Sequence, residues 1–128
     1  MEKRYLNEIK VAEEFIKIAE EVVKVSLRTS ANRVYFALEK AVIGFLLFKG
    51  LEVPKNHQKI WDVSSELLGE DSYQLFRELY DLRMQADYGT ESIIVEFNEK
   101  IVMEKINKVN NFINMIKDMS KEEKDGDK

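Results

Sequence analysis

Apolar side chains recur at steps of three and four residues along most of the chain, which is the spacing of one face of an α-helix. In the first stretch, this pattern predicts a helix from about Glu2 to Leu27 with charged residues on its opposite face. The positions of its inner face are Tyr5, Ile9, Ala12, Ile16, Ala19, Val23 and Ser26. Thr29 or Ser30 is then the expected N-cap of a second helix, which ends at Gly50. This second helix is apolar nearly all round, so we expect it at the centre of the fold or shared between the core and a partner.

Two shorter helices are predicted in the middle of the chain. Asn56 is the expected N-cap of the first, and Gly69 ends it. Asp71 or Ser72 is the expected N-cap of the second, and Gly89 marks its end. The second helix carries a clean apolar stripe made of Leu75, Leu79, Leu82 and Ala86.

The chain changes character after this fourth helix. The run Ile93, Ile94 and Val95 is β-branched and therefore unfavourable in a helix, so residues 90–97 are expected to form an extended connection packed on the bundle. Asn98 is then the expected N-cap of a last helix. Its apolar stripe is Val102, Ile106, Val109, Ile113 and Ile116. Residues 120–128 have no apolar side chain, which predicts a charged tail that is frayed or disordered.

Long helices joined by short connections predict an all-α fold, an antiparallel up-and-down bundle of four to five helices that forms one domain over residues 1–119. The length of 128 residues suits a single domain, and a hydrophobic fraction of 45% is enough for a core. The absence of cysteine excludes disulfides, thiol chemistry and cysteine zinc sites. No apolar run is long enough to span a membrane, and we expect a cytoplasmic location.

Charge is distributed unevenly along the chain. The net charge of -4 argues against a general nucleic-acid binder. Residues 61–99 carry two basic and ten acidic groups, whereas residues 29–60 carry five basic and two acidic groups. We therefore expect basic and acidic helices to face each other or a second subunit. The alternative is an acidic docking face for a basic partner.

Arg83 and its neighbours are the first candidates for chemistry. Arg83 flanks the apolar stripe of the fourth helix, and Asp87 follows it by one turn. One interpretation is a structural ion pair between the two residues, and the other is that the planar guanidinium of Arg83 is positioned to bind a phosphate or carboxylate. Tyr88 comes five residues after Arg83, so the two side chains meet only if the helix ends near Asp87 or a second subunit brings them together. Tyr88 could instead close the end of the bundle.

His57 and Arg33 are the other candidates. His57 is the only histidine, at a predicted helix start, where it could serve as a base or have a structural role. Arg33, near the start of the second helix, could pair with the acidic segment or reach a phosphate. The sequence has no metal-ligand spacing and no glycine-rich phosphate loop, so neither a metal nor another cofactor is expected.

Three motifs, in this order, resemble those of the HEPN family in its branch of small archaeal and bacterial proteins. The segment 32–37, Asn-Arg-Val-Tyr-Phe-Ala, resembles the R-x-Y-[YF]-A opening of a long apolar helix. The segment 55–57, Lys-Asn-His, resembles K-x-H, and the segment 82–88, Leu-Arg-Met-Gln-Ala-Asp-Tyr, resembles L-R-x-x-A-D-Y. The likeness covers roughly residues 5–118, and the order and spacing of the motifs are more specific than any one of them.

The resemblance implies a four- or five-helix bundle that is usually a homodimer and often the partner of a minimal nucleotidyltransferase in toxin–antitoxin pairs. Many HEPN proteins are metal-independent ribonucleases that use an R-x4–6-H motif near the end of the fourth helix, paired across the dimer. Arg83 matches that arginine, whereas Tyr88 stands in the place of the histidine. A phenol is a poorer general base than an imidazole at neutral pH, and acidic surroundings repel RNA.

The leading hypothesis is a dimeric HEPN accessory protein in which Arg83, Asp87 and Tyr88 line a cleft at the dimer axis. It would bind a nucleotide, another phosphate-bearing ligand or a cognate nucleotidyltransferase, with Arg33 and His57 as further ligand-binding candidates. The second hypothesis is a metal-independent endoribonuclease toxin, in which Arg83 and Tyr88 are catalytic and His57 could assist. The third is a non-catalytic helical scaffold.

Overall fold

The computed structural model describes residues 2–91 and 94–126, and within them the side chains of residues 4–91 and 94–121. The described residues form five helices and no strand, which confirms the predicted all-α class. The helices are α1 (Glu2–Val22), α2 (Leu27–Phe48), α3 (His57–Leu68), α4 (Glu70–Tyr88) and α5 (Glu99–Gly126). None of them, in the part of the chain that the structure describes, is long and apolar enough to cross a membrane.

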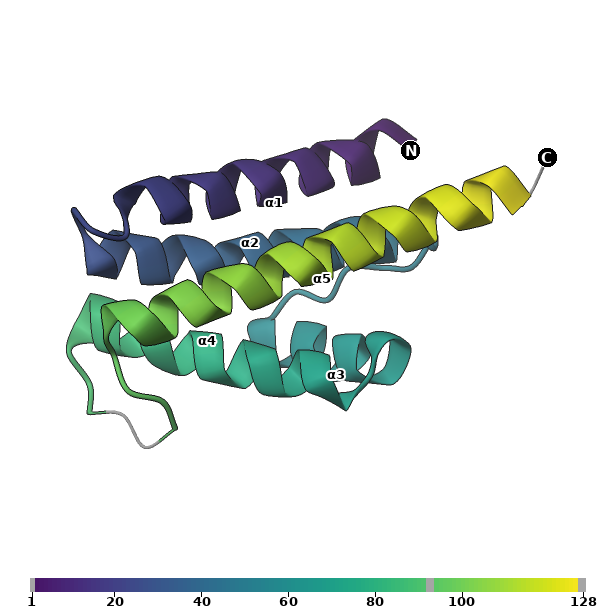
Figure 1. The fold of residues 1–128 in the computed structure, drawn as a ribbon. Coiled ribbons are helices and arrows are strands. Elements are labelled where there is room, and N and C mark those ends of the chain that lie inside the picture. The colour runs from purple at the N-terminus through teal and green to yellow at the C-terminus, as the bar shows by residue number, and fades with distance from the viewer. Residues whose placement is uncertain (1, 92–93, 127–128) are drawn as a thin grey trace.

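The long helices alternate in direction and surround α2. Figure 1 shows α1 and α4 on either side of α2, with α5 lying along the bundle in front of them. The short helix α3 packs against α4, and the chain reverses between them. The predicted up-and-down bundle is therefore observed, with α2 packed against all four other helices.

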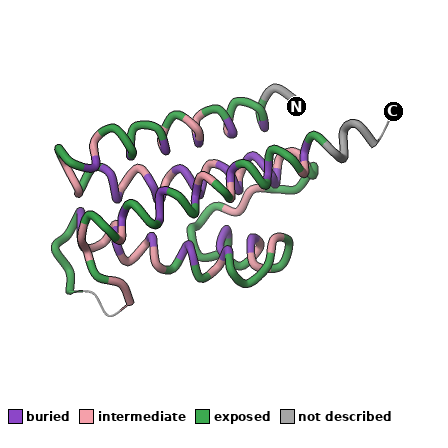
Figure 2. Tube along the Cα trace, in the orientation of Figure 1, coloured by how far each residue is buried: buried purple, intermediate pink, exposed green. Residues whose placement is uncertain are grey.

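The core is built around α2, which explains why its sequence is apolar nearly all round. Buried positions are densest along α2 and form inward stripes on the surrounding helices (Figure 2). The largest fully buried side chains include Tyr35, Leu38, Phe45, Leu46, Phe76, Leu79, Leu82, Ile106, Ile113 and Ile116. Gly44 lets α1 approach α2 closely, because a Cβ there would lie 2.8 Å from Ile9 Cδ1 and 3.2 Å from the carbonyl oxygen of Tyr5.

The turn between α1 and α2 comes earlier than the sequence pattern predicts. α1 ends at Val22, and Ser26 is the N-cap of α2, since its Oγ accepts a hydrogen bond of 3.2 Å from the Thr29 amide. The predicted caps, Thr29 and Ser30, are therefore wrong. Ser30 lies inside the helix, where its hydroxyl donates to the Ala19 carbonyl at 2.8 Å. The sequence pattern placed Ser26 on the inner face of α1, whereas its hydroxyl accepts a hydrogen bond from a free backbone amide at the start of α2.

The helix starts at Asn56 and Asn98 and the helix end at Gly89 are confirmed. Both asparagine side chains accept a backbone amide hydrogen bond from the first turn that follows, at 2.9 Å in each case. Gly89 ends α4 with a φ of 67°, the left-handed conformation that suits glycine.

The start of α4 differs from the prediction. The helix begins at Glu70, directly after Gly69, and no side-chain hydrogen bond caps it. Ser72 donates its hydroxyl to the Gly69 carbonyl at 2.8 Å, so neither Asp71 nor Ser72 is the N-cap. The reason is that Gly69, with a φ of 103°, turns the chain within a single residue.

The connection between α4 and α5 packs on the bundle, as predicted, although Ser92 and Ile93 lie outside the described residues. Gln85 Nε2 donates to the carbonyl oxygen of Val95 at 3.0 Å, which fastens the connection to α4. Beyond it, α5 continues past residue 119 to Gly126, so the segment predicted as a tail is helical that far.

A buried ion pair joins α4 and α5 across the bundle. Lys105 of α5 is only 4% exposed, and its Nζ lies 2.8 Å from Glu78 Oε2 of the acidic helix α4. Because Lys105 lies outside the basic segment 29–60, this pair does not test the expectation that basic and acidic helices face each other.

Candidate functional site

Tyr35 lies at the centre of an aromatic cluster between α2, α3 and α4 and is fully buried. Its ring makes edge contacts with Phe76 and Tyr80, with centroid distances of 6.2 and 5.8 Å. Its hydroxyl accepts a hydrogen bond from Trp61 Nε1 at 3.2 Å and donates one to Glu39 Oε2 at 2.8 Å. Burial, and then the charge of Glu39, raise the pKa of Tyr35 well above its usual value. Tyr35 therefore stays protonated and remains a hydrogen-bond donor.

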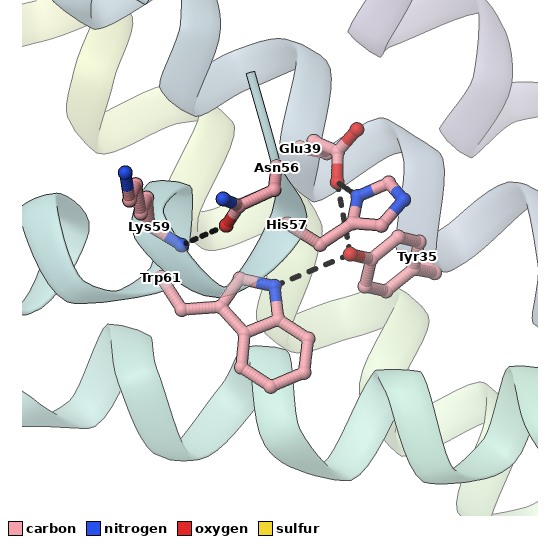
Figure 3. A network of polar contacts seen from close by, with 6 residues as sticks. All are labelled: Tyr35, Glu39, Asn56, His57, Lys59 and Trp61. Carbon is pink, nitrogen blue, oxygen red and sulfur yellow. Dashed lines mark hydrogen bonds and ion pairs between the residues drawn. The ribbon is translucent and has the colours of Figure 1, made fainter. Parts of the chain in front are cut away.

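Glu39 extends this contact to His57. The carboxylate is one turn after Tyr35 on α2, its residue is 8% exposed, and the same Oε2 lies 2.7 Å from His57 Nδ1. His57 is the first residue of α3, and 47% of its side chain is exposed. In Figure 3 the second ring nitrogen, Nε2, points away from Glu39. We call these four residues, Tyr35, Glu39, His57 and Trp61, the Tyr35 network.

Arg83 also lies close to the Tyr35 ring. Its guanidinium carbon is 4.8 Å from the ring centroid of Phe36, 5.5 Å from that of Tyr35 and 6.0 Å from that of Tyr80. Its Nε lies 3.4 Å from Asp87 Oδ2, which is the ion pair that the sequence predicts one turn apart. Within the described residues this buried Nε makes no hydrogen bond, so aromatic faces and a charge hold the arginine in place.

A hollow of about 560 Å³ opens where the start of α2 meets the end of α4. Its polar lining comes from Arg28, Thr29, Asn32 and Arg33 of α2 and from Asp87 and Tyr88 of α4. Asn32 joins the two helices, because its Nδ2 donates to Asp87 Oδ2 at 3.0 Å and its Oδ1 accepts from Arg33 Nη1 at 3.2 Å. We call this site the arginine hollow.

The arginine hollow favours anions although the chain as a whole is acidic. It combines two guanidinium groups, those of Arg28 and Arg33, with the single carboxylate of Asp87. That carboxylate is already engaged by Asn32 and by Arg83. The hollow also lies at the first turns of α2, where the helix dipole presents partial positive charge. A phosphate group fits this combination of charge and donors.

The structure brings some of the predicted site residues together and separates another. Arg33, Asp87 and Tyr88 line the arginine hollow, and Arg83 adjoins it through Asp87. His57 does not line it and lies instead beside Tyr35 and Glu39. Tyr88 is 68% exposed, so it does not close the end of the bundle.

Glu39 is one of three site residues that the sequence pattern did not single out, the others being Arg28 and Trp61. The signal for Glu39 was an acidic residue in the middle of a helix that is apolar nearly all round, one turn after a tyrosine. A carboxylate at such a position must be buried, and a buried carboxylate requires hydrogen-bond donors. No group of three or more histidine, cysteine or acidic side chains among the described residues could hold a metal ion.

The comparisons with known proteins place these sites within one domain family. The family model described as "HEPN domain" matches residues 9–119, which is most of the chain. No curated protein matches the chain. The matched range contains the arginine hollow, Arg83 and the Tyr35 network.

Proposed function

The chain belongs to the HEPN family, and on that premise we propose that it binds a nucleotide or another phosphate-bearing ligand in the arginine hollow. The observation that carries the proposal is the meeting of two arginines with an exposed tyrosine in one open hollow. HEPN membership supports a nucleotide-related function but does not identify the residues that bind the ligand. The lining of the arginine hollow provides candidates for them.

Arg28 and Arg33 are the proposed phosphate ligands. Guanidinium groups present several N–H donors in a plane and bind phosphate oxygens in pairs. The Arg33 guanidinium lies over the Phe15 ring, at 5.2 Å from its centroid, and donates to Asn32. Arg33 is therefore positioned before a ligand arrives, which reduces the entropy lost on binding.

Tyr88 is the proposed contact for a base. It is the last residue of α4, it is 68% exposed, and it borders the same hollow as the two arginines. Base–aromatic stacking contributes about 1–3 kcal/mol per base and accepts any base. A nucleotide uses both the cations and the ring, whereas inorganic phosphate uses only the cations.

The test is titration calorimetry with ATP as the probe and inorganic phosphate as the comparison. We expect Arg28→Gln/Arg33→Gln to lose at least about tenfold in ATP affinity, which corresponds to roughly 1.4 kcal/mol. The matched control is Arg77→Gln, an exposed arginine of α4 outside the hollow, which should bind as the parent does. Equal ATP affinity in the double variant and the control, or no binding by the parent, would contradict the proposal.

We further propose that the protein acts as a homodimer through the face of α2 that its neighbours leave partly uncovered. Phe36, Ile43 and Leu47 recur at helical spacing on α2 and are only half-buried. The guanidinium of Arg83 lies over the Phe36 ring, so a partner on this face would place Arg83 at the dimer cleft. Ile43→Lys should then halve the mass measured by light scattering. A parent that is monomeric at all concentrations would contradict this arrangement.

The family also supports a minimal nucleotidyltransferase as partner, within a toxin–antitoxin pair. The test is co-purification with a minimal nucleotidyltransferase that is expressed together with this chain, and growth of cells that express either protein alone. Arg83→Met should weaken the complex, because it removes the cation while filling most of the same volume between the rings. Co-purification that is equal for the parent and Arg83→Met would show that Arg83 is not part of the interface.

A further inference from the structure

A second hollow, of about 440 Å³, lies between α1 and α5 at the end of the bundle where α1 begins and α5 ends (Figure 1). One of its walls is formed by α1, with Tyr5, Leu6 and Ile9. The other wall is formed by α5, between Lys117 and Lys121. We call this site the α1–α5 groove. It shares no lining residue with the arginine hollow, so the proposed function does not use it.

The α1 wall of the groove is apolar and continues the core outward. Ile9 is 6% exposed and belongs to the core, whereas Leu6 is 52% exposed at the rim. An apolar surface that runs from the core into an open hollow of this size is typical of a site for a small molecule. The α1 wall therefore favours an apolar body as the occupant.

The α5 wall places a hydroxyl where the pattern of the helix calls for an apolar side chain. Val109, Ile113 and Ile116 form the buried stripe of α5, and Ser120 follows at the same helical spacing. Ser120 is 7% exposed, and its Oγ makes no hydrogen bond within the described residues. A buried hydroxyl without a partner is unfavourable, because it gives up its hydrogen bonds to water. An apolar side chain would avoid this loss, so packing does not explain the serine.

Tyr5 brings a second hydroxyl to the same groove from the opposite wall. Its ring packs edge-on against Phe48, with a centroid distance of 5.0 Å, and the residue is 7% exposed. In the part of the chain that the structure describes, the Tyr5 hydroxyl makes no hydrogen bond. Two walls of one groove thus supply two hydroxyl donors without acceptors. An oxygen atom of a bound molecule would supply the acceptor that they lack.

The charged groups at the rim of the groove balance each other. Lys117 Nζ lies 3.0 Å from Glu13 Oε2, so this pair joins the two walls. Asp118 and Lys121 add one charge of each sign. An anionic ligand and a cationic ligand would each meet a repelling group, and each would lose solvation without a net gain. The rim therefore favours an uncharged ligand.

We infer that the α1–α5 groove binds an uncharged small molecule that combines an apolar body with an oxygen able to accept hydrogen bonds, as in an alcohol or a ketone. The apolar body lies against Leu6 and Ile9, and the oxygen accepts from the hydroxyls of Ser120 and Tyr5. The inference does not depend on the proposed function, because it concerns another end of the bundle and a ligand without phosphate.

The experiment is a titration with 1-octanol, followed by NMR of the isoleucine and leucine methyl groups. The variants Leu6→Met and Ile9→Val assign the two signals of the groove. We expect these two signals to shift until they saturate, with 2-octanone as well as with 1-octanol. Octanoate and octylammonium have the same chain length and a charge, so they should bind about tenfold more weakly than 1-octanol.

Two kinds of variant separate the hydroxyls from the shape of the groove. Ser120→Ala and Tyr5→Phe each remove one hydroxyl, so each should weaken 1-octanol binding about fivefold or more. Ser120→Leu continues the apolar stripe of α5 into the groove, so it should abolish binding and raise Tm by roughly 2–6 °C. The matched control is Ser65→Ala, at a half-buried serine of α3 outside the groove, which should bind as the parent does.

Each outcome decides for or against the inference. Methyl shifts that do not saturate, or 1-octanol binding that is equal in Ser120→Ala and the control, would overturn it. Tighter binding of octanoate or octylammonium than of 1-octanol would overturn the uncharged class of ligand. A lower Tm in Ser120→Leu would show that this position does not open onto an apolar groove. Ser120→Ala alone decides if Tyr5→Phe fails to fold, and ATP binding without 1-octanol binding overturns this inference while leaving the proposed function intact.

Discussion

Replacing Tyr35 by phenylalanine removes a single oxygen from the most connected polar position of the core. The ring still fills its place among Phe76, Tyr80 and the Arg83 guanidinium. The hydroxyl, however, is the acceptor for Trp61 and a donor to Glu39. The variant therefore isolates the contribution of the hydrogen bonds from that of the packing.

The expected loss follows from the two bonds. A hydrogen bond to a charged group contributes about 1.5–3 kcal/mol, and a buried donor without an acceptor costs about 1–3 kcal/mol. Trp61 is 7% exposed, so its Nε1 has little access to water as a substitute. Because Glu39 keeps His57 as a partner, we expect a combined loss of about 2–4 kcal/mol in the free energy of unfolding. In a chain of this size that lowers Tm by roughly 10 °C.

The pH dependence gives a second, independent signature. The pKa of Tyr35 is raised in the folded state, so the folded protein keeps a proton that the unfolded chain releases above about pH 10. The stabilisation is complete below that pH and is lost as pH rises further, at about 1.4 kcal/mol per pH unit. Tyr35→Phe has no such proton, so its stability should fall less steeply between about pH 10 and 11.

The assay is urea unfolding followed by circular dichroism, at neutral pH and in the alkaline range. Tyr88→Phe is the matched control, because that ring is 68% exposed, and its stability should stay within about 0.5 kcal/mol of the parent. The reasoning about the network would be refuted if Tyr35→Phe were as stable as the control at neutral pH and if its free energy of unfolding fell with alkaline pH as steeply as that of the parent.

Three further changes test how the helices are joined. Gly44→Ala should lower the free energy of unfolding by about 1–3 kcal/mol, because the new Cβ would meet Ile9 Cδ1 and this overpacking outweighs a helix-propensity gain of about 1 kcal/mol. The double variant Gly44→Ala/Ile9→Val should recover part of this loss in urea unfolding. Lys105→Met leaves Glu78 without its partner and should cost about 2–3 kcal/mol, most of which Glu78→Leu should restore in a double-mutant cycle. Ser26→Ala removes the N-cap of α2 and should lower the free energy of unfolding by about 1 kcal/mol, whereas Ser26→Asp should keep it; an unchanged Ser26→Ala would mean that the cap does not stabilise α2.

Much of the fold followed from rules that act within one turn of helix. Asn56 and Asn98 cap because an asparagine before an amphipathic stretch satisfies free amides locally. The central place of α2 followed from its apolar pattern. Ser26 was misplaced because it fits two local patterns equally well, as a small residue on the inner face of α1 and as a cap for α2. Only the position at which the chain reverses decides between them.

In the candidate site, too, the sequence predicts contacts within one helical turn but not contacts between distant residues. The contact of Arg83 with Asp87 is one turn long, and the sequence predicts it. Asn32 and Asp87 are 55 residues apart, and their hydrogen bond depends on how α2 and α4 cross. Glu39 and His57 are separated by 18 residues, and no periodicity describes the path between them.

The direction of the helices has a practical consequence for measurement. α1 begins and α5 ends at the same end of the bundle, whereas the turn into α2 and the last turn of α4, which border the arginine hollow, lie at the opposite end (Figure 1). A tag or a surface tether attached at either end of the chain therefore leaves the hollow facing the solution. Immobilised protein should keep the full nucleotide affinity of the free protein, and a domain fused at either end of the chain would leave the hollow uncovered.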